Sequence, residues 1–261
     1  MANFRPFVEV AKESNCRIFA AIQSPVPSIS PQNMETIAMT RATASNYWAQ
    51  DIDGLFLDRG WFSDWPYQAP FYEKLRELPF PHLMEPKDKF YHLLTGTGRK
   101  EEDIRLEIAP TLPAILAEGK SALIDFTISD DLPKWDKVGR VYDVLLRIGI
   151  SEVTELDQLS FKLNGKDLTK GNMRTINMMY RMGAPRNRQT GGYWFVFRPK
   201  RDQWPTKGEN RLEIALVRRD PEVISTVSIG NIELETKYLM GRNFYRDDVD
   251  PDLGPYKTFV Q

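Results

Sequence analysis

The chain has very few of the residues that crosslink proteins or bind transition metals. Among its 261 residues there is one cysteine, Cys16, and there are two histidines, His82 and His92. A single thiol excludes an intrachain disulfide and a structural zinc site built from paired thiolates. With only two histidines in the sequence, we do not expect a histidine-rich catalytic metal centre. We therefore expect neither a disulfide framework nor a metal site built from cysteine or histidine.

A strong charge of one sign and long apolar runs are also lacking. The formal net charge is −1, from 35 basic and 36 acidic residues, so we expect no nucleic-acid partner. No apolar run is long enough to span a bilayer, so we expect no membrane partner either. The first residues, with Phe4, Phe7, Val8 and Ala11, form an amphipathic pattern rather than a secretion signal. The expected location is the cytoplasm, unless the sequence begins within a longer protein.

The spacing of apolar residues changes near residue 100. Before that point, helical and strand patterns alternate in the order αβαβαβ, with strands expected at residues 17–23, 54–58 and 89–94. Near-continuous apolar runs of this kind are typical of parallel strands that are buried on both faces. We therefore predict a partial parallel β/α-barrel over residues 1–100, which belongs to the α/β class.

After residue 100 the apolar residues recur at every second position. Ile124, Phe126 and Ile128 alternate with polar residues, and Asn164-Gly165 is a strong signal for a tight hairpin turn. Many such strands without intervening helices indicate an all-β, antiparallel, jelly-roll-like β-sandwich over residues 101–245. Residues 246–261 are expected to form an irregular tail.

The stretch from residue 51 to residue 67 carries the clearest functional signal. Asp53 begins the turn into the second strand and is expected to cap it, whereas Asp58 stands at the end of that strand. Active sites of β/α-barrels lie at the carboxyl ends of the strands, so Asp58 is the candidate catalytic carboxylate. Hydrolysis of a glycosidic bond needs two carboxyl groups, and Asp64 is the nearest second one in the sequence. The structural alternative is that Asp58 caps its turn or pairs with Arg59 or Arg41.

Aromatic side chains crowd the loop that follows Asp58. Indole and phenol rings stack on the apolar faces of sugars, and nearby polar groups bind the hydroxyls. The alternative is that these rings pack beneath the loop and seal an interface. The candidate substrate-binding residues are Trp61, Trp65, Tyr67, Arg59 and Gln23.

Four stretches of the sequence are similar to a known group of proteins. They are VEVAKESNCRIFAAIQ, ATASNYWAQDIDGLFLDRGW, FYEKLREL…PKDKFYHLL and LSFKLNG…YWFVFRP…GENRLEIAL. Together they resemble the C-terminal half of bacterial glycoside-hydrolase-like proteins, in which a TIM-type barrel precedes a β-sandwich. The resemblance implies hydrolysis by acid/base carboxylates without a cofactor. It also implies that Asp58 is a nucleophile or stabiliser, and that its acid/base partner lies on an earlier strand absent from this chain.

The leading expectation is therefore a truncated glycoside-hydrolase-like protein that acts on or binds a carbohydrate. The alternative is a non-catalytic carbohydrate-binding or structural β-sandwich module, in which Trp194 or Trp204 would contact the ligand. A third reading is an assembly protein without a small ligand. The open edge of an incomplete barrel would pair with a second copy of the chain or with the missing N-terminal half.

Overall fold

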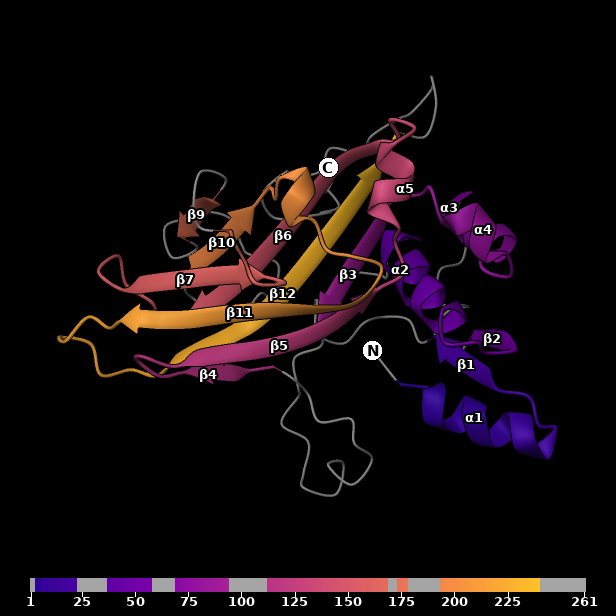
Figure 1. Ribbon diagram of the computed structural model, residues 1–261, viewed down its shortest axis with the longest axis horizontal. Coiled ribbons are helices and arrows are strands. Elements are labelled where there is room, and N and C mark those ends of the chain that lie inside the picture. Colours follow the sequence, from indigo (N-terminus) through magenta and orange to yellow (C-terminus); the bar gives the residue numbers. More distant parts are fainter. Residues whose placement is uncertain are drawn as a thin grey trace. The chain divides into compact units, whose positions relative to one another are not determined.

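The computed structural model describes residues 3–22, 37–57, 69–93, 112–168, 173–177 and 193–239 (Figure 1). The chain divides into two compact units. Unit 1 comprises residues 1–91, 128–142 and 235–261, and unit 2 comprises residues 92–127 and 143–234. The domain boundaries predicted at residues 100 and 245 lie outside the described residues and stay predictions.

Unit 1 begins with a helix, α1 (Arg5–Ser14), which precedes a strand–helix–strand unit. That unit consists of β1 (Phe19–Ile22), α2 (Ile37–Trp48) and β2 (Gly54–Leu57). The two strands are parallel, with Phe19 opposite Gly54 and Ile22 opposite Leu57. Asp53 joins their starts as expected of a cap, because its carboxylate accepts the Ile18 N–H at 2.7 Å. Its own N–H donates to the Ile18 carbonyl oxygen at 2.9 Å.

Three short helices complete the helical part of unit 1 in the described residues: α3 (Ala69–Glu77), α4 (Pro81–Met84) and α5 (Leu132–Asp136). One apolar core gathers side chains from α1, β1, α2 and the segments around α3 and α4. Its buried members are Val8, Ala20, Ile22, Ala44, Tyr47, Ile52, Leu78 and Met84. The helices therefore cover one face of the β1–β2 pair.

The remaining strands form two sheets, and several of them contribute residues to both units. A six-stranded sheet has the order β3-β12-β6-β10-β9, and β4 also pairs with β12. A four-stranded sheet has the order β5-β11-β7-β8. The strands are β3 (Lys89–Leu93), β4 (Ala114–Leu116), β5 (Ser121–Ile128), β6 (Val141–Ser151), β7 (Gln158–Leu163), β8 (Lys166–Asp167), β9 (Met173–Asn177), β10 (Tyr193–Phe197), β11 (Gly208–Arg218) and β12 (Val227–Tyr238). A 3-10 helix (Arg201–Gln203) precedes β11.

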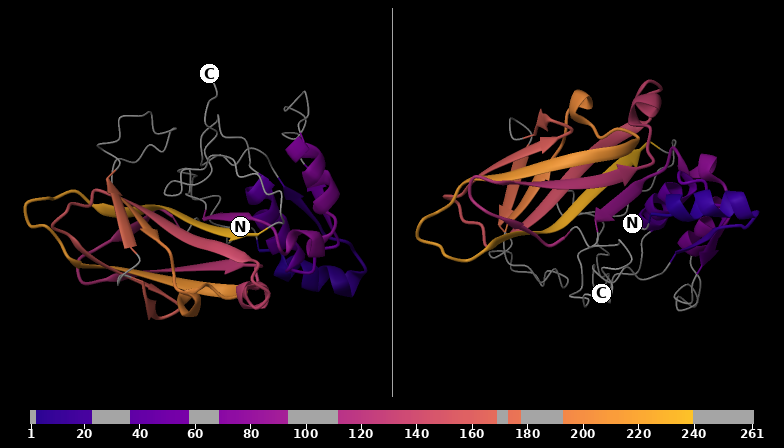
Figure 2. Two further views of the ribbon diagram at one scale, coloured as in Figure 1. Left: turned by 90° about the horizontal axis from the view of Figure 1, so that it is seen from above. Right: turned by 60° about the horizontal axis from the view of Figure 1, so that its bottom comes forward.

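Within unit 2 the two sheets pack face to face, and Figure 2 shows β11 and β12 in separate layers. Phe161 of β7 contacts Phe195 and Phe197 of β10, with ring centroids 5.0 Å apart in both pairs. Antiparallel pairing of β10 with β6 places Phe195 opposite Ile148, and both side chains are buried. The core of unit 2 therefore includes alternating apolar residues of the kind that the sequence pattern predicted for the sandwich.

The predicted partial parallel β/α-barrel is wrong. Among the described strands only β1 and β2 form a parallel sheet, and the two larger sheets are mostly antiparallel. β3, expected as the third barrel strand, instead pairs with β12. The physical reason lies in the polar side chains of β3. Lys89 and Tyr91 bind the Asp130 carboxylate, and Thr236 and Tyr238 of β12 bind the same carboxylate.

The close approach of Gly149 to Trp194 gives a first prediction. A Cβ atom at Gly149 would lie 3.2 Å from the indole ring, so Gly149→Ala must displace the buried Trp194 side chain. We expect the substitution to lower the free energy of unfolding by about 1–2 kcal/mol, as overpacking does. Urea unfolding followed by circular dichroism measures this loss. Gly139→Ala is not a suitable control, because Gly139 has a φ of 67° and any side chain there would strain the backbone. Ala215→Gly is the control, because it adds no atoms to the core. Its near-ultraviolet circular dichroism spectrum, which reports the packing of aromatic rings, should match that of the wild type.

Candidate functional site

The site predicted from the sequence follows the carboxyl ends of β1 and β2. Ile22 and Leu57 are register partners, so the two described strands end at the same level. Gln23 is the next residue after β1, and Asp58 is the next residue after β2. The predicted site residues all lie outside the described residues, so their roles stay predictions: Gln23, Asp58, Arg59, Trp61, Trp65 and Tyr67.

The faces of β2 agree with the alternation that the sequence predicts. Leu55 and Leu57 pack against the core of unit 1, whereas Phe56 is 58% exposed on the opposite face. Arg41, one proposed structural partner of Asp58, is bound by two other carboxylates. Its guanidinium donates to Glu77 at 2.7 Å and to Glu73 at 2.9 Å.

The tryptophans proposed as alternative ligand platforms are engaged in the fold. Trp194 faces away from Phe195 as expected, but it is only 1% exposed and lies against Gly149, so it is not a ligand platform. Trp204 is half-buried, and its indole N–H donates to the Pro199 carbonyl oxygen at 3.0 Å. Neither residue offers a fully exposed indole face.

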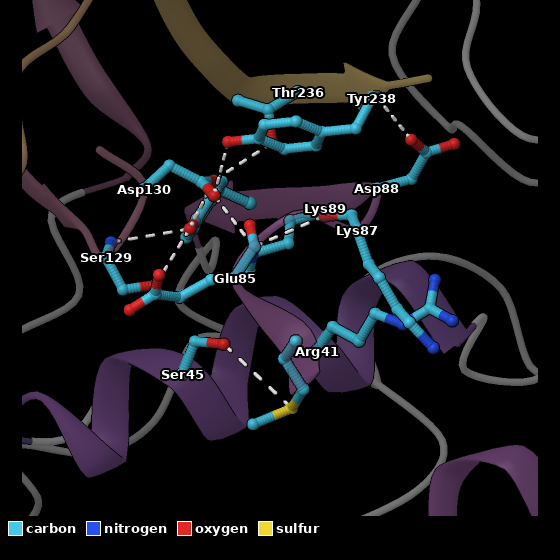
Figure 3. Close-up of polar contacts among 12 residues, drawn as sticks. Arg41, Ser45, Glu85, Lys87, Asp88, Lys89, Ser129, Asp130, Thr236 and Tyr238 are labelled. Atoms are coloured by element: carbon cyan, nitrogen blue, oxygen red, sulfur yellow. Dashed lines mark hydrogen bonds and ion pairs between the residues drawn. The ribbon is translucent and has the colours of Figure 1, made fainter. Parts of the chain in front are cut away.

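Among the described residues, a group of buried polar side chains in unit 1 surrounds Asp130, which lies in the segment between β5 and α5. We call this group the Asp130 cluster. It comprises Lys89, Tyr91, Ser129, Asp130, Thr236 and Tyr238 (Figure 3). Lys89 Nζ lies 2.7 Å from one carboxylate oxygen of Asp130, which also accepts the Tyr238 hydroxyl at 2.8 Å. The second oxygen accepts the Tyr91 hydroxyl at 2.8 Å and the Thr236 hydroxyl at 3.0 Å.

Burial sets the protonation states of the tyrosines in this cluster. Burial, together with the negative charge of Asp130, raises the pKa of the Tyr91 hydroxyl well above its usual value. The same two causes raise the pKa of the Tyr238 hydroxyl. Both phenols therefore stay protonated and act as hydrogen-bond donors at neutral pH. Because Lys89 and Asp130 are also almost fully buried, the cluster fixes β3 and β12 rather than presenting a reactive group to solvent.

A second buried ionic group links α2 to α3 in unit 1. Glu77 is bound by Arg41 and also by Lys87, which itself lies 3.3 Å from Glu73. Burial opposes ionisation of Glu77, but the hydrogen bonds that it accepts from Arg41 and Lys87 outweigh this effect and hold the pKa of that carboxyl at about 2. Glu77 is thus a permanently charged anchor near neutral pH, and not a proton donor suited to glycosidic hydrolysis.

In unit 2 a third carboxylate holds two loops together. The Asp157 side chain is fully buried and binds Arg219, while it also accepts the Asp220 N–H at 2.7 Å and the Thr154 N–H at 2.8 Å. Arg219 reaches onward to the Ser225 carbonyl oxygen at 3.0 Å. This arrangement fixes the loop between β6 and β7 to the loop between β11 and β12.

These three groups were not anticipated from the sequence, and little in the sequence signals them. Hydrogen-bonded members of the Asp130 cluster are separated by up to 108 residues, the distance along the sequence between Asp130 and Tyr238. In the sequence, Asp130 is one of several acids in a loop. Lys89 belongs to a short strand, and the residues around it do not indicate which strand it pairs with. Only the parity of Lys89 with Tyr91, and of Thr236 with Tyr238, hints that each pair shares one side of its strand.

In the parts of the chain that the structure describes, no group of three or more histidine, cysteine, aspartate or glutamate side chains is arranged to hold a metal ion. No described helix has the length and apolar character required to cross a membrane. Neither the protein-family models nor the curated proteins contain a match to this chain.

Proposed function

We propose that this chain is a carbohydrate-binding protein that binds its ligand, without cleaving it, where β1 and β2 end. The observation that carries the proposal is the shared end of the two parallel strands, at Ile22 and Leu57. Ligands of α/β proteins are bound beyond the carboxyl ends of such strands. The residues that follow in the sequence, Gln23 after β1 and Asp58 after β2, are of the types that bind hydroxyl groups.

The composition of the sequence after β2 supports a sugar as the ligand. Trp61, Trp65 and Tyr67 provide flat rings within seven residues, and Arg59 adds a charged hydrogen-bond donor. Rings stack on the apolar faces of pyranoses, while charged and amide groups select among the hydroxyls. The resemblance to glycoside-hydrolase-like proteins points to the same class of ligand.

Binding without turnover is favoured because hydrolysis needs two correctly spaced carboxyl groups. The sequence offers Asp58 and, in the same loop, Asp64. Among the described residues, two buried acids are held in ion pairs: Glu77 by Arg41 in unit 1, and Asp157 by Arg219 in unit 2. Neither is free to act as an acid or a base.

Replacing the aromatic residues tests the proposal. Trp61→Ala and Trp65→Ala should each weaken binding of the best polysaccharide from a panel by about tenfold, because a stacked ring contributes about 1 kcal/mol or more. Affinity electrophoresis or isothermal titration calorimetry measures the effect. Trp204→Phe is the matched control: Trp204 lies in the sandwich, and its replacement should leave the affinity unchanged.

Three outcomes would contradict the proposal. A protein that binds none of the polysaccharides in the panel is not a carbohydrate-binding protein of this kind. Release of reducing sugar by the wild type, abolished in Asp58→Asn, would identify a hydrolase and refute the non-catalytic assignment. A loss of binding in Trp204→Phe instead of Trp61→Ala would move the ligand to the sandwich.

A further inference from the structure

Basic residues are unevenly distributed along the chain. The formal net charge of the whole sequence is −1, yet residues 168–201 include eight lysines and arginines and no aspartate or glutamate. This stretch contains β9 and β10, which pair with each other at one edge of the six-stranded sheet (Figure 1). A local excess of positive charge in an otherwise balanced chain is typical of a surface that binds an anionic partner.

The strand register places two arginines of this stretch on one face of the β9–β10 pair. Arg174 of β9 is the register partner of Val196 of β10, so their side chains share a face. Arg198 directly follows β10 and lies 3.6 Å from Asp143 of β6. Asp143 shares a side of β6 with Arg147, the register partner of Val196, so Arg198 is on this face too. Arg174 and Arg198 are both exposed, and diagonal neighbours on a sheet face are about 7–8 Å apart.

The turn after β10 presents two more cations, Lys200 and Arg201, which are also exposed. The Gln203 side chain holds this turn in place. Its oxygen accepts the Lys200 backbone N–H at 2.9 Å, and its amide nitrogen donates to the Asp167 carbonyl oxygen at 2.6 Å. The backbone that carries these cations is therefore fixed before a ligand binds, which lowers the entropic cost of binding.

Lys166 of β8 belongs to the same surface. Its ammonium group donates to the backbone carbonyl oxygen of Asp202, in the 3-10 helix that begins at Arg201. We call the exposed cations of this region the basic surface of unit 2; they are Lys166, Arg174, Arg198, Lys200 and Arg201. Asp143, Asp167 and Asp202 lie beside them, and the five cations outnumber these three acids. The surface therefore keeps a positive balance of charge.

The side chains of the basic surface favour a polyanion without bases. Guanidinium groups bind carboxylates and other oxyanions through two parallel hydrogen bonds. Proteins that bind single-stranded nucleic acids add exposed aromatic rings on which the bases stack. None of the five residues of the surface is aromatic, and Trp194 of β10 is only 1% exposed. A polymer with repeated negative charges and no bases therefore fits these residues best.

We propose that the basic surface of unit 2 binds an acidic polysaccharide, whose carboxylate or sulfate groups pair with its five cations. The choice of a sugar polymer rests on the proposed function of the chain, whereas the need for negative charge rests on the described residues alone. The basic surface belongs to unit 2, and β1 and β2 belong to unit 1. Substitutions can therefore remove the two sets of contacts separately.

Polysaccharides of different charge provide the first test. Isothermal titration calorimetry with heparin, polygalacturonate and dextran compares a sulfated, a carboxylated and a neutral polymer. Heparin or polygalacturonate should bind at least about tenfold more tightly than dextran, and the tighter of the two identifies the anionic group. Its affinity should fall more than about tenfold between about 50 and 200 mM salt, because salt screens these contacts and opposes the release of counterions.

Removal of two cations provides the second test. Lys200→Gln combined with Arg201→Gln should weaken binding of the tighter acidic polysaccharide by about tenfold. The matched control is Lys120→Gln combined with Lys137→Gln, which changes the net charge equally at exposed positions outside the basic surface. This control should leave the affinity close to that of the wild type. Circular dichroism of each variant verifies that it is folded.

Equal affinities for dextran and for the two acidic polysaccharides would overturn the proposal and leave the proposed function intact. Equal losses of affinity in the two double variants would do the same. Duplex DNA that binds as tightly as heparin would overturn the assignment to a polysaccharide, and so would a protein that binds none of the three sugars. If the Lys200→Gln, Arg201→Gln variant weakens binding and Trp61→Ala does not, the basic surface stands and the proposed site beyond β1 and β2 falls.

Discussion

Replacing Asp130 with asparagine is expected to lower the free energy of unfolding by about 3–5 kcal/mol, the cost of breaking a buried ion pair at one partner. Lys89 is 1% exposed and would lose its only anionic partner among the described residues, keeping the Glu85 and Lys87 carbonyl oxygens. The amide nitrogen of the new side chain would also replace one of the two oxygens that now accept hydroxyl hydrogen bonds. Urea unfolding followed by circular dichroism at neutral pH measures the loss.

The matched control for this prediction is Asp125→Asn. Asp125 also forms an ion pair, with Arg211 at 2.7 Å, but both side chains are more than half exposed. An exposed pair contributes little, so the unfolding midpoint of this variant should stay close to that of the wild type. Equal losses of unfolding free energy in Asp130→Asn and Asp125→Asn would show that the buried Asp130 cluster stabilises the fold no more than an exposed ion pair does.

A double substitution separates the charge from the packing of the cluster. Buried ion pairs can often be replaced by apolar side chains of similar volume without loss of stability. Lys89→Met combined with Asp130→Leu should therefore be more stable than Asp130→Asn alone, although the hydroxyls of Tyr91 and Tyr238 lose their acceptor. If the double variant is the least stable of the set, the hydroxyl hydrogen bonds rather than the ion pair carry the stability.

Local structure could be predicted well from the sequence because it depends on neighbouring residues. Alternation predicted that Ile124, Phe126 and Ile128 face one core, and all three are buried along β5. The Asn164-Gly165 pair predicted the turn between β7 and β8, where both residues have positive φ, 51° and 78°. Positive φ at two successive residues is the requirement that Asn-Gly meets most easily.

The choice of strand partner could not be predicted in the same way. Residues 89–93 have the apolar character of a strand, but nothing local decides whether that strand joins β1 and β2 or the larger sheet. The pairing of this strand with β12 depends on contacts with Asp130, Thr236 and Tyr238. These contacts are distant in sequence: Lys89 and Asp130 are 41 residues apart, and Asp88 and Tyr238 are 150 residues apart. A local alternation of strands and helices is therefore not sufficient to predict a barrel.

In the candidate site, too, the local positions of residues could be predicted from the sequence, whereas their tertiary contacts could not. The sequence predicted strands that end at Gln23 and Asp58; the described strands β1 and β2 run to Ile22 and Leu57, and the two site residues themselves lie outside the described residues. What the sequence could not indicate is which carboxylates are sequestered. Glu77 and Asp157 look like ordinary surface acids by composition, yet both side chains are buried against arginine. Burial of this kind depends on tertiary contacts and leaves no periodic trace.

Replacing Glu77 with glutamine should lower the free energy of unfolding at pH 7 by about 3–5 kcal/mol, because Arg41 would keep a buried charge without its closest carboxylate. The side chains of Arg41 and Glu77 are 6% and 2% exposed. Glu73→Gln is the matched control, since Glu73 binds the same guanidinium but is 41% exposed, and its loss should be distinctly smaller. Chemical unfolding of the three proteins in one buffer makes the comparison.

The effect of Glu77→Gln should also depend on pH with a definite sign. The folded-state pKa of Glu77, about 2, lies below its usual value of 4.5, so the unfolded chain binds the proton more readily. The stabilisation from Glu77 is therefore fully present above about pH 5 and is lost as the pH falls from there toward 2. The difference in unfolding free energy between wild type and Glu77→Gln should shrink by on the order of 2 kcal/mol between pH 6 and pH 3. A difference that stays constant over this range would mean that Glu77 acts through packing and not through its charge.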